Sequence, residues 1–167
     1  GLDPSLGFII FGPSPVSYFG FALDCAGDVN GDGIDDIIIG AYTTNGYRGS
    51  AYVIFGKKAS SLPNIFLSSG LSENQGFVIN ANTVQDYLGL AVAGAGDVNN
   101  DGVDDVMVGA AYASGLKGAV YIIFGSKNGL SNVTATLEFD TKRGSSIVGA
   151  LAGDALGSAL SKAGDIN

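Results

Sequence analysis

The sequence predicts an all-β protein built from repeated sheets, and three observations support this fold class. Glycine makes up 27 of the 167 residues, about twice its usual share of roughly 7%, and the glycines separate short apolar runs. No stretch keeps the 3.6-residue periodicity of an amphipathic helix. One pattern of residues recurs along the chain at a fixed interval, which indicates a repeat architecture.

The recurring pattern occupies residues 28–36 and 97–105. It reads Asp-Val-Asn-Gly-Asp-Gly-Ile-Asp-Asp in the first copy and Asp-Val-Asn-Asn-Asp-Gly-Val-Asp-Asp in the second. A third copy opens at Asp165 and the given sequence stops within it, at Asn167. The copies begin 69 and 68 residues apart, so the repeated unit describes this chain better than its total length does.

Each unit carries four short apolar runs that we expect to form strands. The run from Ile37 to Ile39 has no polar alternation, as expected of a strand covered on both faces. Four short strands per repeated unit are typical of a β-propeller blade. The expected strands are residues 18–26, 37–39, 50–56 and 76–80 in the first unit, and 87–92, 106–110, 119–125 and about 146–150 in the second.

We therefore expect an incomplete propeller of four-stranded antiparallel blades. Residues 1–17 are the expected end of a preceding blade followed by a turn, with residues 8–11 as its last strand. Residues 18–80 and 81–150 are two complete blades, and residues 151–167 open the next one with a turn and a strand. Propellers close with about four to eight blades, so these residues belong either to a longer chain or to several copies that complete each other. The break within the third loop favours the longer chain.

The repeated loop has the composition of a calcium-binding loop. Oxygen-bearing side chains occupy its first, third, fifth and ninth positions, and the seventh residue can lend its backbone carbonyl. The glycine at the sixth position allows a sharp turn. Clustered carboxylates repel one another unless a cation lies among them, and nine of the sixteen acidic residues fall in these loops: Asp28, Asp32, Asp35, Asp36, Asp97, Asp101, Asp104, Asp105 and Asp165.

Other interpretations of the loop fit less well. An EF-hand requires an acidic ligand at position twelve and flanking helices, but that position is Ile39 or Val108, inside an expected strand. A metal-free Asp-Gly turn is common once, but two such similar nine-residue copies are not. The hard oxygen donors and the absence of histidine argue against zinc and copper, and the many-ligand loop favours calcium over magnesium. No mobile helix pair follows the loops, so a structural calcium is expected and not a sensor.

The motifs around the loops resemble FG-GAP repeats, the blades of the seven-bladed propeller in integrin alpha subunits. The resemblance covers nearly the whole chain and rests on Tyr18-Phe19-Gly20, Tyr87-Leu88-Gly89, the loop itself and the Gly-Ala pair after the second strand. The chain departs from the usual Gly-Ala-Pro at Tyr42 and Ala111, which affects turns and not ligands. The third repeat has Leu156-Gly157 at the Phe-Gly position.

The resemblance implies two complete calcium sites and one partial site. Asp35 and Asp104, at the eighth position, are not expected to be ligands. The implied ligands are Asp28, Asn30, Asp32, the Ile34 carbonyl and Asp36; then Asp97, Asn99, Asp101, the Val103 carbonyl and Asp105; and, for the partial site, Asp165 and Asn167.

Composition excludes several functions for these residues. The net charge is −8 and the eight Lys and Arg are scattered singly, so no basic patch is expected for nucleic acid. Without histidine there is no Ser-His-Asp triad. The Asp35-Asp36 pair could serve glycoside chemistry, but its recurrence at Asp104-Asp105 favours a role in the loop. We predict a non-enzymatic chain.

The sequence also bears on targeting. No signal peptide is visible, since the chain begins without a basic segment followed by an apolar core. The charge-free residues 4–23 contain prolines and glycines and do not predict a membrane helix. Cys25 is the only cysteine and is expected to be a small buried residue.

Connections between the expected strands hold candidate recognition residues. Tyr42, Tyr47, Phe66 and Tyr112 are aromatic residues in connections and are candidates for a binding surface. Asn132 begins an Asn-Val-Thr triplet, the acceptor pattern for N-glycosylation, within a polar connection.

Three functions remain open at this point. The first is an extracellular or cell-surface adhesion module that binds a protein or glycan ligand. The second is a structural subunit of an extracellular fibre, in which incomplete blades pack against other copies. The third is an accessory propeller of a larger secreted hydrolase. Millimolar external calcium suits low-affinity surface loops in all three cases.

Overall fold

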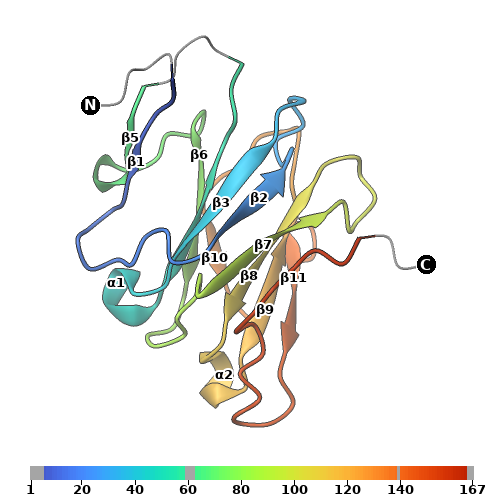
Figure 1. Ribbon diagram of the computed structural model, residues 1–167. Coiled ribbons are helices and arrows are strands. Elements are labelled where there is room, and N and C mark those ends of the chain that lie inside the picture. The colour runs from blue at the N-terminus through green and yellow to red at the C-terminus, as the bar shows by residue number, and fades with distance from the viewer. Residues whose placement is uncertain (1–5, 59–62, 139, 165–167) are drawn as a thin grey trace.

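The computed structural model describes residues 6–58, 63–138 and 140–164. It is an all-β structure (Figure 1), and this confirms the predicted fold class. Two one-turn helices, α1 (Thr44–Tyr47) and α2 (Ala113–Leu116), and a 3₁₀ turn (Leu67–Ser69) lie in connections. The strands are β1 (Ile10–Phe11), β2 (Leu23–Gly27), β3 (Asp36–Ala41), β4 (Ser50–Ile54), β5 (Ile65–Phe66), β6 (Gly76–Ala81), β7 (Ala91–Gly96), β8 (Asp105–Ala110), β9 (Ala119–Ile123), β10 (Val133–Ala135) and β11 (Gly144–Val148).

Two four-stranded antiparallel blades form the body of the structure. The first contains β2, β3, β4 and β6 in sequence order, and the second contains β7, β8, β9 and β11 in the same order. The turns after β2 and β7 lie at one end of the blades, and α1 and α2 lie at the other (Figure 1). The acidic loops therefore lie far from the two helical turns.

Each blade lends a short strand to its neighbour, which the sequence did not predict. Strand β10 lies in the connection between β9 and β11 of the second blade, yet it pairs in parallel with β6, the outer strand of the first blade. Strand β5, in the corresponding connection of the first blade, pairs in parallel with β1. Strand β1 therefore pairs with the connection of the first blade in the same way as β6 pairs with the connection of the second blade.

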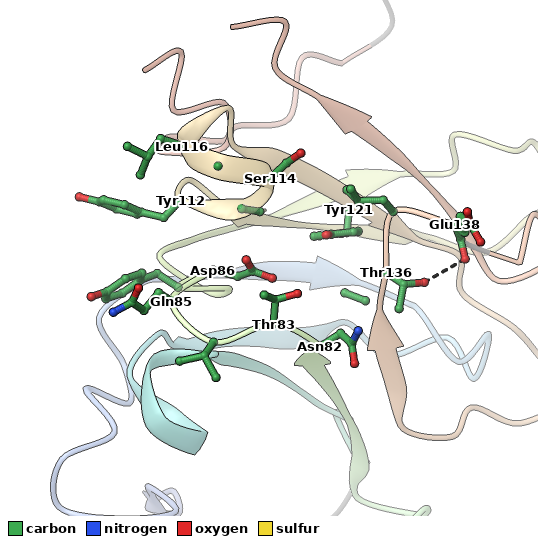
Figure 2. Close-up of a pocket in the computed structure, with 16 residues that line it drawn as sticks. Asn82, Thr83, Gln85, Asp86, Tyr112, Ser114, Leu116, Tyr121, Thr136 and Glu138 are labelled. Atoms are coloured by element: carbon green, nitrogen blue, oxygen red, sulfur yellow. Dashed lines mark hydrogen bonds between the residues drawn. The ribbon is translucent and has the colours of Figure 1, made fainter. Parts of the chain in front are cut away.

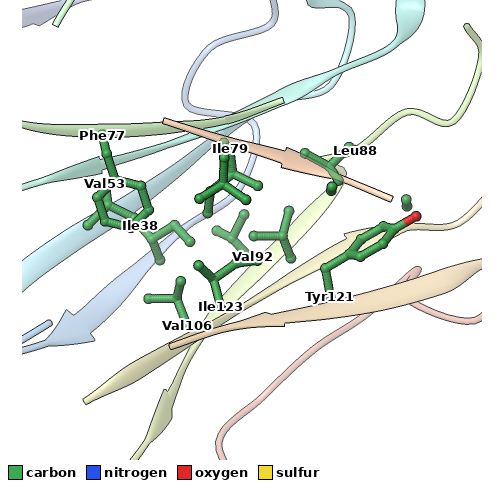
Figure 3. Close-up of a cluster of buried hydrophobic side chains, with 14 of the residues drawn as sticks. Ile38, Val53, Phe77, Ile79, Leu88, Val92, Val106, Tyr121 and Ile123 are labelled. Atoms are coloured by element: carbon green, nitrogen blue, oxygen red, sulfur yellow. The ribbon is translucent and has the colours of Figure 1, made fainter. Parts of the chain in front are cut away.

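The main core lies between the two blades. Ile38, Val53 and Phe77 from the first blade meet Val106 and Ile123 from the second in one buried cluster (Figure 3). Ile39, on the opposite face of β3, belongs to a separate buried cluster with Tyr52, Ile54, Ile65 and Leu67. The expected burial of both faces of this strand is confirmed. Burying such side chains contributes about 1.5–3 kcal/mol each.

The expected strand over residues 18–26 is wrong in its first half. Tyr18 has φ 48° and Gly20 has φ +85°, and the N–H of Phe21 donates to the carbonyl of Tyr18 at 3.1 Å. This segment is a turn, and only Leu23–Gly27 is extended. The expected strand over residues 87–92 of the second unit is wrong in the same way, since Tyr87 has φ 55° and the strand begins at Ala91.

Two further expectations fail, one near the end of the described chain and one at Cys25. The last strand is Gly144–Val148, and residues 150–160 form turns with an isolated parallel bridge between Leu156 and Gly118 in place of a strand. Cys25, in the edge strand β2, is exposed and not buried. Within the described ranges, no helix is long and apolar enough to cross a membrane.

Candidate functional site

The first acidic loop joins β2 to β3 and folds its side-chain oxygens inward onto its own backbone. Asp28 accepts hydrogen bonds from the N–H groups of Asp32 at 2.9 Å and Gly33 at 2.7 Å. The side-chain oxygen of Asn30 accepts from the same Asp32 N–H at 2.9 Å. Asp32 in turn accepts from the N–H of Ile34 at 3.0 Å. The first and third positions of the loop therefore converge on the fifth.

Asp36, at the ninth position, closes the loop from inside the protein. Its side chain is 1% exposed and accepts from the N–H groups of Val29 at 3.0 Å and Gly56 at 2.8 Å. The pKa of Asp36 is raised to about 6, chiefly by burial and to a lesser extent by the charges of Asp32 and Asp28, while the two hydrogen bonds oppose the rise. A buried carboxylate next to two others is costly to ionise unless a cation compensates it.

The second loop repeats this geometry between β7 and β8. Asp97 accepts from the N–H groups of Asp101 at 2.9 Å and Gly102 at 2.8 Å. The side-chain oxygen of Asn99 accepts from Asp101 N–H at 3.0 Å. Asp101 accepts from the N–H of Val103 at 3.0 Å. Asn99 also donates to the Asp101 carboxylate at 2.9 Å, a contact between side chains within the loop.

Asp105 plays the part of Asp36 in the second loop. It is fully buried and accepts from the N–H groups of Val98 and Gly125, each at 2.9 Å. Burial raises its pKa, and Asp101 and Asp97 add to that rise. In both loops, which begin 69 residues apart, the same side-chain oxygens thus accept hydrogen bonds from backbone N–H groups at the same positions.

The donor set fits a hard cation. Each loop offers carboxylate and amide oxygens with one fully buried carboxylate, which suits calcium. In the described residues, no group of three or more Asp, Glu, His or Cys side chains is arranged to hold a metal, and the oxygens turn to backbone amides instead. The expected ligands Asp165 and Asn167 lie outside the described residues.

A row of aromatic rings occupies the opposite end of the blades. Tyr42 contacts Phe21 at a ring-centroid distance of 4.8 Å, Tyr18 at 5.3 Å and Tyr87 at 6.1 Å. Tyr87 continues the row to Tyr47 at 5.7 Å and to Tyr112 at 4.8 Å. The row is Tyr18, Phe21, Tyr42, Tyr47, Tyr87 and Tyr112, and we call it the aromatic row.

The row joins three of the four aromatic residues chosen from the sequence. Tyr42, Tyr47 and Tyr112 lie in it, whereas Phe66 stacks on Phe11 at 4.6 Å elsewhere in the structure. Tyr18 and Tyr87 were missed as surface candidates. Both residues directly precede the Phe-Gly or Leu-Gly pair, and this position could have identified them. The turn at each pair lies at the same end of the blades as the connections that carry Tyr42 and Tyr47.

A cavity of about 1000 Å³ adjoins the aromatic row. Residues 82–87 form one wall, α2 with Tyr112 a second, and residues 135–138 a third (Figure 2). Two carboxylates, Asp86 and Glu138, line it together with hydroxyl and amide groups, and no lysine or arginine is among its lining residues. This cavity could not be predicted from the sequence, because its three walls are far apart in the chain.

Asp86 lines the cavity and is 8% exposed. Burial raises its pKa, against hydrogen bonds from the hydroxyl and backbone of Thr83 that lower it. Tyr121 is also buried, and its burial together with the charge of Asp86 raises the pKa of Tyr121 to about 12. Asp86 therefore binds its proton more tightly in the folded chain than in the unfolded one.

We expect Asp86→Asn to gain stability relative to the parent chain as the pH rises. The stabilisation from a carboxyl group with a raised pKa is fully present below the ordinary value of 3.8 and is lost as the pH passes the folded-state pKa. The asparagine retains an acceptor for Thr83 and does not ionise. Urea unfolding from pH 4 to pH 7 measures the difference. A constant difference over this range would show that folding does not raise the pKa of Asp86.

Asn132 is exposed, and its side-chain oxygen accepts from the N–H of Val78 at 2.8 Å. This contact holds the connection that carries β10 against β6. Glycosylation of its nitrogen stays a prediction.

Similarity to known proteins agrees with this geometry. A family model of the FG-GAP repeat matches residues 23–54 and 88–123. The two matched segments are FG-GAP repeats, and the resemblance found in the sequence is confirmed.

Integrin alpha subunits are among the relatives. The chain is 34% identical to integrin alpha-4 of Xenopus laevis over 116 residues, covering 69% of this chain and 10% of that protein. It is 33% identical to integrin alpha-6 of Gallus gallus over 148 residues, covering 87% of this chain and 13% of the relative. It is 41% identical to integrin alpha pat-2 of Caenorhabditis elegans over 110 residues, or 62% of this chain and 9% of the relative. The chain thus spans about a tenth of the length of these curated relatives.

Proposed function

We propose that the chain is a calcium-stabilised propeller segment of an extracellular or cell-surface protein, acting as a non-catalytic adhesion or ligand-binding module. The observation that carries this proposal is the pair of FG-GAP repeats with matching oxygen-lined loops. The integrin alpha relatives support adhesion and a cell-surface setting.

In this proposal each loop holds one calcium ion through the ligands expected from the sequence. The ion supplies positive charge that compensates the carboxylates and fixes the turn between two strands. Asp36 and Asp105 contribute the buried oxygen, and the exposed loop residues contribute the others. Calcium therefore has a structural part, and ligand binding belongs to the other end of the blades.

The aromatic row and its adjoining cavity are the proposed surface for a protein or glycan ligand. Aromatic side chains supply much of the contact energy in protein recognition, and Tyr18, Tyr47 and Tyr112 are all exposed. The acidic lining at Asp86 and Glu138 favours neutral polar or cationic groups over anions. The ligand binds across both blades, since the row and the cavity draw residues from each.

The direct test is thermal unfolding of the 167-residue chain in calcium, in magnesium and in chelator. With a dissociation constant of about 0.1 mM, about 1 mM calcium stabilises each site by roughly 1.4 kcal/mol. Two sites then raise the melting temperature by about 5–10 °C. Magnesium should give a smaller rise. An equal melting temperature in calcium and chelator would refute the calcium part of the proposal.

A second candidate, a subunit of an extracellular fibre, is favoured by exposed apolar residues on both blades. Phe21 and Leu23 are exposed on the first blade, and Ile147, Val148 and Leu151 on the second. Such surfaces normally pack against further protein, and contacts that do not close a ring generate filaments. Light scattering in calcium distinguishes the candidates, because a fibre subunit forms concentration-dependent assemblies and a binding module does not.

A further inference from the structure

Asp104 of the second loop holds the backbone of Asp28, the first residue of the first loop. The N–H of Asp28 donates to the Asp104 carboxylate at 2.9 Å. The N–H of Asp104 donates back to the carbonyl of Asp28 at 3.2 Å. The two residues are 76 positions apart and belong to different blades. This two-point contact fixes the position at which the first loop begins.

The surrounding residues are shaped to this contact. A Cβ atom added to Gly27 would lie 2.3 Å from the Asp104 carboxylate, so the position before Asp28 must lack a side chain. The N–H of Ser126 donates to the carbonyl of Val29 at 2.9 Å. The side chain of Lys127 lies against Gly31, with its Cγ 2.4 Å from a Cβ built there. The second blade therefore supports the first loop at several points.

Asp104 also stands between two proposed ligands of its own loop. Its neighbours are Val103, which offers a backbone carbonyl, and Asp105, which offers the buried carboxylate. A cation in the second loop fixes both neighbours and so fixes Asp104. Because Asp104 holds Asp28, order in the second loop is transmitted to the first ligand of the first loop.

We propose that Asp104 is a positioning residue that couples the two cation sites, so that cation binding at the second loop strengthens binding at the first. This inference rests on the proposed calcium binding. Coupling between sites is reciprocal, so loading the first loop strengthens the second by the same factor. The eighth position of the loop, which is not expected to bind the cation, thereby gains a function between blades.

Calcium titration calorimetry on Asp104→Ala tests the proposal. Removing a side chain that orients a metal ligand typically lowers affinity 10–100-fold, so we expect the first site to weaken about tenfold or more. Asp32→Ala and Asp101→Ala each leave one loop intact and assign the two affinities. Asp101→Ala should itself weaken the first site, whose ligands it leaves in place.

Two matched variants separate positioning from a general loss of structure. Asp104→Asn retains an acceptor oxygen for Asp28 N–H and should restore most of the affinity. Asp35→Ala changes the eighth position of the first loop, where the side chain is exposed, and should leave the second site unchanged. Hydrogen exchange at the Asp28 amide should accelerate in Asp104→Ala and not in Asp35→Ala.

The possible results separate the coupling from the calcium binding on which it rests. Two calcium sites with unchanged affinities in Asp104→Ala would overturn the coupling and leave the proposed function standing. No calcium binding by the parent chain would overturn the proposed function and the coupling with it. A first-site loss in Asp104→Ala that Asp104→Asn reverses supports the coupling.

Discussion

Replacing Asp36 with alanine should lower the free energy of unfolding by about 2–4 kcal/mol in calcium, because two buried backbone donors lose their acceptor and the proposed site loses a ligand. The donors are the N–H groups of Val29 and Gly56, which join the loop to the end of β4. In chelator the loss should be smaller. There the ionised Asp36 is itself unfavourable at neutral pH, since its pKa is raised to about 6, and this cost disappears with the carboxylate.

Asp36→Asn is the matched control for this change. It preserves the shape and one acceptor oxygen but removes the charge. In chelator at pH 7 it should be close to the parent chain in stability, whereas in calcium it should be weaker. Thermal unfolding of both variants under both conditions measures the difference. An identical loss for Asp36→Ala in calcium and in chelator would mean that the residue acts only through its hydrogen bonds.

The sequence predicted best what is local in the chain. The loop positions from Asp28 to Asp36 are close in sequence, and the hydrogen bonds that their side chains accept come from within the loop, apart from the contact of Asp36 with Gly56. The order of the strands followed from the repeat, because each blade is formed by consecutive strands. The all-β class and the four-stranded sheets were accordingly predicted.

Contacts between blades were not predictable in this way. The pairing of β10 with β6 joins residues that are 54 positions apart, for example Val133 with Ile79. The apolar residues around Phe19 resemble a strand, but Tyr18 and Gly20 have positive φ, and the N–H of Gly20 donates to the carbonyl of Gly40 in β3 at 3.0 Å. The contact of Asp104 with Asp28 likewise joins two segments. Periodicity and propensity describe one segment at a time, and these features depend on two.

The Phe-Gly turn and the Gly-Ala strand end interlock across the blades, and Gly40 is the test of that interlock. A Cβ atom added to Gly40 of β3 would lie 2.0 Å from the carbonyl oxygen of Gly89, in the turn that opens the second blade. Gly109 stands in the same relation to Gly157, at the same 2.0 Å. The repeat therefore requires the absence of a side chain where one blade meets the next.

We expect Gly40→Ala to destabilise the chain by about 3 kcal/mol, because overpacking against a backbone carbonyl has no side-chain rotation to relieve it. The melting temperature should fall by about 6–12 °C. Gly46→Ala is the control, since its added Cβ would meet nothing within 4 Å while its φ of +69° strains an alanine, at about 1 kcal/mol. Both changes reduce the entropy of the unfolded chain equally, so the loss in Gly40→Ala reports the contact between blades and the loss in Gly46→Ala reports the strain of a positive φ. A Gly40→Ala chain as stable as the parent chain would mean that the blades accommodate the added methyl group at this point without strain.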